Sequence, residues 1–122
     1  NIQIMPIENL RSYCLAKDAV TESFPFDEHT LVVKVAGKMF ALFSLEKHPL
    51  QVNLKCDPEK AIDLRERYQS VIPGYHMNKK HWNTLVIDGE LSKELVEELV
   101  DHSYELVVSK LSKKVKSEFL LD

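Results

Sequence analysis

Apolar side chains recur with a helical period in three segments of the chain. The first segment covers residues 7–17, the second starts at Asp57-Pro58 and ends near Tyr68, and the third follows Ser92. Asp and Ser at these starts can accept hydrogen bonds from free helical N–H groups, and Pro at the first helical position needs no donor. The apolar stripe of the third segment consists of Leu95, Val96, Leu99, Val100, Leu106, Val107 and Leu111. We therefore predict three amphipathic helices, the last one reaching Leu111.

Two runs of β-branched and aromatic residues, 30–36 and 39–46, flank Gly37-Lys38. Glycine readily adopts the positive φ of a tight turn, so the runs predict a β-hairpin. The pairs counted outward from that turn are Val35 with Phe40 and Val33 with Leu42 on one face, and Lys34 with Ala41 on the other. The first face is the one expected to be buried.

Three further segments have the pattern of strands. Residues 50–56 alternate apolar and polar side chains, as in a half-exposed antiparallel strand, and residues 82–87 form another apolar run. Residues 21–26 predict a short edge strand, because Pro25 cannot donate to a sheet ladder. The order of elements predicts an α+β fold with two layers, an antiparallel sheet with helices packed on one face.

Length and composition indicate a single domain over residues 1–122. The chain is 44% hydrophobic and 29% charged, which is ordinary for a globular protein. We expect residues 1–6 to be an extended or cloning-derived start and residues 112–122 to be a basic C-terminal tail, with Lys110, Lys113, Lys114 and Lys116 as a solvated helix end. The net charge of −3 gives no general attraction to nucleic acid, so such binding would need a local basic patch.

Cysteine spacing and hydropathy indicate where in the cell the protein is expected to be. Cys14 and Cys56 form no CxxC pair, which predicts two reduced, buried thiols and a cytoplasmic location. No apolar run reaches the roughly 20 residues of a bilayer span, so no membrane partner is expected.

Known catalytic motifs are missing from the sequence. Three glycines cannot supply GxGxxG or GxxxxGK[ST], and no spacing picks out a nucleophile with its base. His76 and His81 are five residues apart, with Asp88 as a possible oxygen ligand but no thiolate nearby, so the pattern lacks zinc specificity. We expect no enzyme activity, no cofactor and no metal.

The candidate contact surface is a polar and aromatic stretch around the single tryptophan, which we call the Trp82 segment (residues 74–84). Lys79 and Lys80 stand beside Trp82, a combination that lets ammonium groups neutralise phosphates while an indole stacks on a base. The remaining candidates are Asn78 and Asn83, which could position the loop or read polar edges, together with His76 and His81. Lys34, Lys38, Lys47 and Lys55 could extend this basic surface over the outward sheet face.

Two other interpretations of these residues remain open. A lysine-rich strand face can be merely solvated and bind no ligand, since exposed lysines also serve to keep sheet edges from pairing. The segment could also line a cleft of a small-molecule-binding or protein-interaction domain, an arrangement that a buried Trp82 with converging His76 and His81 would favour. Tyr104, in the third helix, is expected to be a boundary residue with a solvated hydroxyl or else a partner contact.

The sequence resembles the MmcQ/YjbR family of small bacterial proteins. The resemblance is carried by Met77-Asn78-Lys79-Lys80-His81-Trp82-Asn83-Thr84, Asp88-Gly89, Asp101-His102-Ser103-Tyr104-Glu105-Leu106-Val107, Thr21-Glu22-Ser23-Phe24-Pro25-Phe26 and Val35-Ala36-Gly37-Lys38-Met39-Phe40-Ala41. It implies a fold related to frataxin and CyaY, also described as a double wing, and a family label of DNA binding that rests on fold analogy. Iron binding is not carried over, because the first helix has only Glu8 before Asp18.

Overall fold

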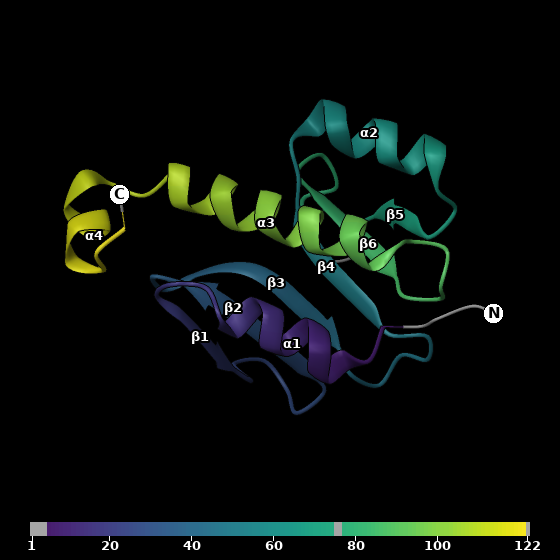
Figure 1. Ribbon diagram of the computed structural model, residues 1–122, viewed down its shortest axis with the longest axis horizontal. Coiled ribbons are helices and arrows are strands. Elements are labelled where there is room, and N and C mark those ends of the chain that lie inside the picture. The colour runs from purple at the N-terminus through teal and green to yellow at the C-terminus, as the bar shows by residue number, and fades with distance from the viewer. Residues whose placement is uncertain (1–4, 75–76, 122) are drawn as a thin grey trace.

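The computed structural model describes residues 5–74 and 77–121, which form an α+β structure of two layers (Figure 1). Its elements in chain order are α1 (Ile7–Leu15), β1 (Val20–Ser23), β2 (Thr30–Val35), β3 (Lys38–Ser44), β4 (Gln51–Lys55), α2 (Pro58–Arg67), β5 (Val71–Pro73), β6 (Trp82–Val86), α3 (Lys93–Ser109) and α4 (Lys113–Glu118). The predicted two-layer fold and its three principal helices are confirmed. Asp57 and Ser92 cap α2 and α3 as expected, by accepting from the N–H groups of Lys60 and Leu95.

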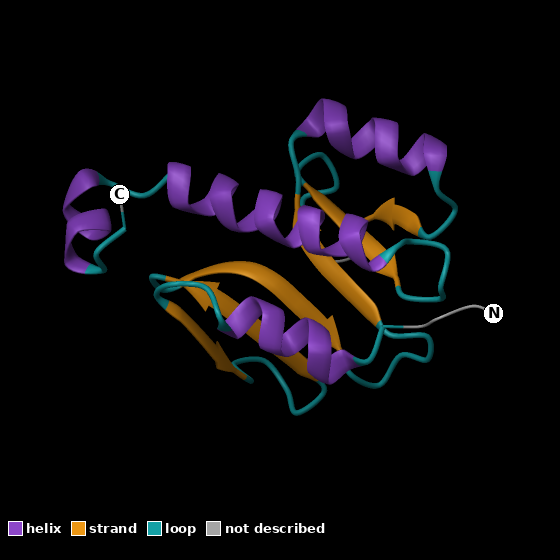
Figure 2. Ribbon diagram, viewed as in Figure 1, coloured by secondary structure: helices purple, strands orange, loops and turns teal. Residues whose placement is uncertain are grey.

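All six strands belong to one antiparallel sheet, in the order β1-β2-β3-β4-β6-β5. In Figure 2, α1 and α3 lie across one face of the sheet, and α2 lies beside β5 and β6. Side chains from all three helices enter the main core, among them Leu10, Ala61 and Leu99. They pack against strand residues such as Phe43 and Val52. We call the opposite side of the sheet the open face.

The hairpin register differs from the prediction. The turn is Ala36-Gly37, both with positive φ, and it pairs Val35 with Lys38. A β-bulge in β3 then places consecutive residues, Phe40 and Ala41, in the same core. Beyond the bulge Val33 pairs with Ala41, and Val32 pairs with Leu42. The predicted pairing was wrong because the sequence does not mark the bulge, and Leu42 therefore lies on the open face.

Two element boundaries also differ from the sequence prediction. The edge strand β1 ends at Ser23, before Pro25, and the short β5 forms the other edge of the sheet. The third helix ends at Ser109, because Ser112 caps a separate helix by accepting from the N–H of Val115. The predicted basic tail is thus partly helical. Within the described residues, no helix is both long and apolar enough to cross a membrane.

Candidate binding site at the Trp82 segment

Trp82 is the first residue of β6, and its side chain lies on the open face, where it is 8% exposed. It packs against Val32 and Leu42, and Met39 and Met77 flank this small second core. Little of the indole is therefore open to a stacking base, because the ring packs on the sheet. The burial of Trp82 is one of the features expected if the Trp82 segment lines a cleft.

Gly74 explains how the chain can pass so close to Trp82. The N–H of Gly74 donates to the carbonyl oxygen of Trp82 at 2.9 Å. A Cβ atom at position 74 would lie 2.8 Å from the Cβ of Trp82, closer than real Cβ atoms approach. Glycine is required at this position by the contact, while its φ is not in the left-handed region.

Asn83 is buried within the protein, 1% exposed, so of its two predicted roles burial favours the positioning of the loop over the reading of polar edges. Its Oδ1 atom accepts a hydrogen bond of 2.7 Å from Nε of Arg65. The same guanidinium donates to the carbonyl oxygens of Lys79 and Trp82, the latter at 3.3 Å. Arg65 thus clamps the Trp82 segment to α2. Sequence reasoning missed this arginine, although its position four residues after the buried Ala61 places it on the inner face of the helix.

Asn78 has the positioning role that was one of its two predicted roles. Its Oδ1 atom accepts from the N–H of Lys80 at 2.9 Å, and its carbonyl accepts from the N–H groups of His81 and Trp82. This is a tight Asx-type turn. Lys79 and Lys80 lie at its tip with exposed side chains, as a phosphate-contacting role requires, while His81 is half-buried. His76 lies outside the described residues.

The junction between β4 and α2 is held by three consecutive backbone N–H groups. Lys55 donates to Oγ of Ser103 at 2.9 Å, Cys56 to the carbonyl of His81 at 2.8 Å, and Asp57 to Nε2 of His102 at 3.1 Å. Two of these acceptors belong to α3 and one to the Trp82 segment. The junction therefore joins the sheet, the segment and the helix layer at one place.

Ser103 accepts through a buried hydroxyl, and His102 accepts through a ring nitrogen that carries no proton. Ser103 is fully buried, and its hydroxyl also donates to the carbonyl of Phe40 at 2.6 Å, so it bridges β3 and β4. Burial, together with the positive charge of Lys60, lowers the pKa of His102. A neutral imidazole can accept at Nε2, which an imidazolium cannot. Sequence reasoning assigned no signal to His102, because its partner is 45 residues away in the chain.

Tyr104 belongs to a contact between α3 and the end of α1. Its hydroxyl, predicted to be solvated, donates to the carbonyl of Asp18 at 2.8 Å. The ammonium group of Lys17 lies 5.3 Å from the centre of the Tyr104 ring and 4.9 Å from that of Tyr13, and it pairs with Asp101. Burial, together with the hydrogen bond to Asp101, raises the pKa of Tyr13 to about 12. These groups stabilise the helix layer.

A cleft of about 410 Å³ opens where the Trp82 segment, the start of α2 and the C-terminal part of α3 meet. Its lining consists of Lys55, Cys56, Asp57, Pro58, Asn78, His81, Trp82, Leu106 and Lys110. Among the described residues, no ion pair is found for the ammonium groups of Lys55 and Lys110. The cleft therefore combines apolar walls with two ammonium groups, one carboxylate and polar hydrogen-bonding side chains.

The open face carries charge of only one sign at its strand positions. Strand alternation places Lys34 and Lys55 on this face, in register with Met39 and Trp82. The six strands contain one acidic residue, Glu22. Glu22 pairs with Arg11 of α1 and so faces the helix layer. A chain with net charge −3 thus has a sheet face on which lysine is the only ionised residue type.

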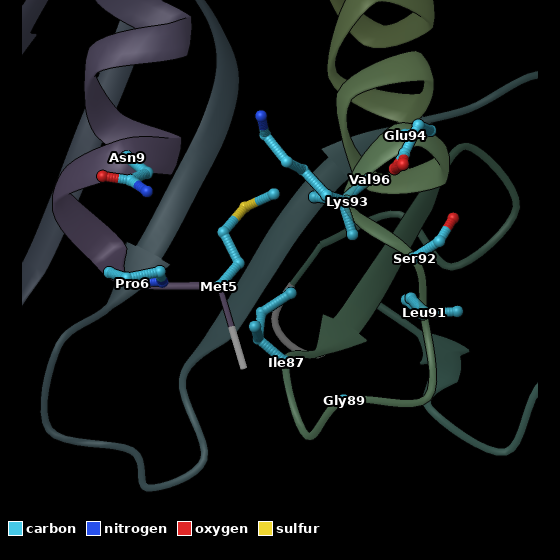
Figure 3. Close-up of a pocket in the computed structure, with 10 residues that line it drawn as sticks. All are labelled: Met5, Pro6, Asn9, Ile87, Gly89, Leu91, Ser92, Lys93, Glu94 and Val96. Atoms are coloured by element: carbon cyan, nitrogen blue, oxygen red, sulfur yellow. The ribbon is translucent and has the colours of Figure 1, made fainter. Parts of the chain in front are cut away.

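A second cavity, of about 530 Å³, lies between the starts of α1 and α3 (Figure 3). Met5 and Lys93 extend into it from the two sides. The first turns of both helices carry a carboxylate, Glu8 and Glu94, which opposes the binding of an anion at the helix ends. None of the predicted site residues lines this cavity.

The described residues contain no group of three His, Cys, Asp or Glu side chains placed to hold a metal ion. Both cysteines are free and buried, as predicted. Burial raises the pKa of Cys14 to about 12 and that of Cys56 to about 11. Thiols in this state are poor nucleophiles.

Comparison with known proteins places these features in a family. A family model described as YjbR matches residues 15–106. The uncharacterised protein YbdF of Escherichia coli O157:H7 is 37% identical over 107 residues, and the match covers 88% of each chain. The uncharacterised protein YjbR of E. coli K12 is 36% identical over 107 residues, and the match covers 88% of this chain and 91% of YjbR. Among solved structures, protein DR2400 of Deinococcus radiodurans superimposes with a TM-score of 0.92 at 42% identity, covering 98% of this chain and 91% of its own. A Pseudomonas syringae protein at 24% identity, with a TM-score of 0.72 over 84% of this chain and 98% of its own, shares the fold.

Proposed function

The chain belongs to the YjbR family, and we propose that it acts as a nucleic-acid-binding module without enzyme activity, through the open face and the Trp82 segment. The observation that carries the proposal is the separation of charge: the strand positions of the open face present lysines and no carboxylate. A polyanion is the ligand class that such a face attracts despite the negative net charge. The relatives are uncharacterised, so the proposal rests on this chain's own residues.

Four lysines form the proposed phosphate-binding set. Lys34 and Lys55 lie on the open face, and the Asx-type turn presents Lys79 and Lys80 at its edge. Asn78 and Arg65 hold that turn in place, which reduces the conformational entropy lost on binding. Trp82 contributes by covering the sheet beneath the turn.

The test is binding to fluorescent DNA of mixed sequence, measured by anisotropy over a range of salt concentrations. Contact of four lysines with phosphates predicts that log Kd rises with log salt with a slope of about 3, both for a single strand and for a duplex. The double variant Lys79→Ala/Lys80→Ala should weaken binding and reduce the slope by one to two.

A matched control is available in α4, where Lys113→Ala/Lys114→Ala removes two adjacent exposed lysines away from the site. This variant has the same net charge as Lys79→Ala/Lys80→Ala. If the two variants bind equally well, or if no binding occurs at low salt, the proposed interface is wrong.

A second candidate function is the binding of a free small molecule in the cleft. The specific observation in its favour is that Trp82 is buried and lines this cleft together with His81. A ligand screen by thermal shift tests it, because a ligand that binds only the native state raises its apparent stability.

The proposal of binding without catalysis is supported by the state of the reactive groups. The thiols are buried with raised pKa values, and the imidazole of His102 is occupied as an acceptor. Such groups are suited to packing and hydrogen bonding, whereas a catalytic base or nucleophile needs access to its substrate.

A further inference from the structure

We infer that the cleft beside His81 holds one nucleotide of a single strand that crosses the open face. This inference rests on the proposed function and narrows it, from nucleic acid in general to single-stranded nucleic acid with a defined nucleotide position. Four observations support the inference: the width of the sheet, and the chemistry, rigidity and location of the cleft.

The open face is too broad to read the interior of a duplex. Six strands spaced about 4.8 Å apart extend over roughly 24 Å, whereas the major groove of B-form DNA is about 12 Å wide. A duplex could touch this face only with its backbone. Met39 and Met77, half-buried on the open side against the small core around Trp82, offer apolar surface that suits the unstacked bases of a single strand.

The cleft has complementary groups for each part of a nucleotide. Lys55 and Lys110 bring two ammonium groups to its lining, and these are suited to a phosphate. His81 and the side-chain amide of Asn78 add hydrogen-bonding groups, while Leu106 offers an apolar wall for a sugar or base. Its volume of about 410 Å³ lies in the range of roughly 300–1,000 Å³ that is usual for ligand pockets.

The cleft lining contains one carboxylate, Asp57, against the two ammonium groups of Lys55 and Lys110, so one positive charge remains in excess. Asp57 is engaged as the cap of α2, and its Oδ2 atom accepts from the N–H of Lys60 at 3.2 Å. Because Asp57 caps the helix and Pro58 has no N–H group, the start of α2 is not itself an anion site. The two lysines from β4 and α3 are the groups that would meet an anion.

The walls of the cleft are fixed before any ligand binds. His81 is tied to Cys56 through its carbonyl, and Asp57 to His102 through its N–H. The side chains of Asn78 and Arg65 hold the loop from within. A site supported in this way selects a ligand by shape, since its atoms do not need to rearrange.

The cleft is continuous with the proposed phosphate path. Lys55 belongs both to the open face and to the cleft lining. Asn78 and His81 line the cleft, and Lys79 and Lys80 lie between them in the sequence. A strand that follows the lysines of the open face therefore reaches the cleft.

The experiment compares a 3′-labelled 12-nucleotide single strand of mixed sequence with the duplex of the same sequence. The single strand should bind the full chain at least several-fold more tightly than the duplex. Lys110→Ala should weaken single-strand binding by about tenfold, the expected loss for one charge-assisted contact, and leave duplex binding within about twofold. Lys110 is exposed and lies at the end of α3, so its replacement should not disturb folding.

Two further measurements keep the inference falsifiable. Lys116→Ala, in α4, is the matched control and should bind the single strand as the unchanged protein does. AMP, used as a mononucleotide probe, should shift the NMR signals of His81, Leu106 and Lys110 before those of the open face. His81→Gln, which keeps the backbone contacts of position 81, should reduce the AMP response.

The outcomes separate this inference from the proposed function. If Lys79→Ala/Lys80→Ala weakens binding but single strand and duplex bind alike and Lys110→Ala has no effect, the nucleotide site is refuted while nucleic-acid binding stands. If AMP binds in the cleft and no strand binds, the site is one for a free small molecule and both nucleic-acid proposals fall. If neither a strand nor AMP binds, the inference is equally refuted.

Discussion

Replacing Ser103 by alanine should destabilise the protein strongly, because one hydroxyl satisfies two backbone groups. It accepts from the N–H of Lys55 at 2.9 Å and donates to the carbonyl of Phe40 at 2.6 Å. An unsatisfied buried group costs about 1–3 kcal/mol. Two such groups would cost about 2–6 kcal/mol. Because the N–H of Lys55 is only partly buried, we expect a loss of about 3 kcal/mol in the free energy of unfolding.

Urea unfolding followed by the fluorescence of Trp82, the single and buried tryptophan, measures this loss. With an m-value of about 1.5 kcal/mol/M, a loss of about 3 kcal/mol lowers the midpoint by about 2 M. Ser109→Ala is the control on the same helix. Its hydroxyl donates to the carbonyl of Leu106 at an exposed position, so the change should stay within about 0.5 kcal/mol. If Ser103→Ala lowers the midpoint no more than Ser109→Ala does, the bridge between β3 and β4 does not stabilise the fold as argued.

Three further predictions concern the structure around the site. Gly74→Ala should cost about 1–3 kcal/mol in urea unfolding, because the added Cβ would lie 2.8 Å from the Cβ of Trp82; an unchanged midpoint would show that the loop can relax. Arg65→Lys should lower the free energy of unfolding by about 2 kcal/mol and speed amide exchange in the Trp82 segment, since lysine cannot reproduce the hydrogen bonds of the guanidinium. The control Arg67→Lys, at an exposed ion pair, should have little effect on either measurement. The pKa of His102 is lowered in the folded state, so the unfolded state binds its proton more readily and stability should fall as pH drops below about 6.5 through the folded pKa. His102→Gln should flatten that part of the pH profile in unfolding experiments between pH 4.5 and 7, and an unaltered profile would assign the dependence to other groups.

The parts of the fold that could be predicted are those whose cause is local in the sequence. Asp57-Pro58 and Ser92 start helices because the cap and the N–H group that it satisfies are three residues apart. The positive φ of Gly37 likewise marks a turn from a few residues. The bulge in β3 has no such local mark, since Phe40 and Ala41 share a core face only through their packing against the helices. One extra residue there was enough to reverse the face assigned to Leu42.

The candidate site was predictable as a segment of sequence and unpredictable as an arrangement in space. The exposure of Lys79 and Lys80 follows from their place in a polar turn. The burial of Trp82 depends on Val32 and Leu42, which lie on strands paired through long-range contacts. The cleft joins residues 55–58 to residues 106–110, and no periodicity or spacing relates segments so far apart.

The residues that carry the family resemblance divide by what their side chains contact, and this division decides which of them bear on function. Asn83 and Ser103 bond within the protein, so finding them in another chain indicates the same fold. Lys79 and Lys80 project from a turn that these internal bonds hold, and neither is needed to build it. Lys79→Ala/Lys80→Ala should therefore leave the unfolding midpoint nearly unchanged while it weakens binding, whereas Asn83→Ala should lower the midpoint and affect binding only through the loss of folded protein. If Lys79→Ala/Lys80→Ala instead lowers stability as Asn83→Ala does, the two lysines belong to the architecture, and nucleic-acid contact must be sought on the open face alone.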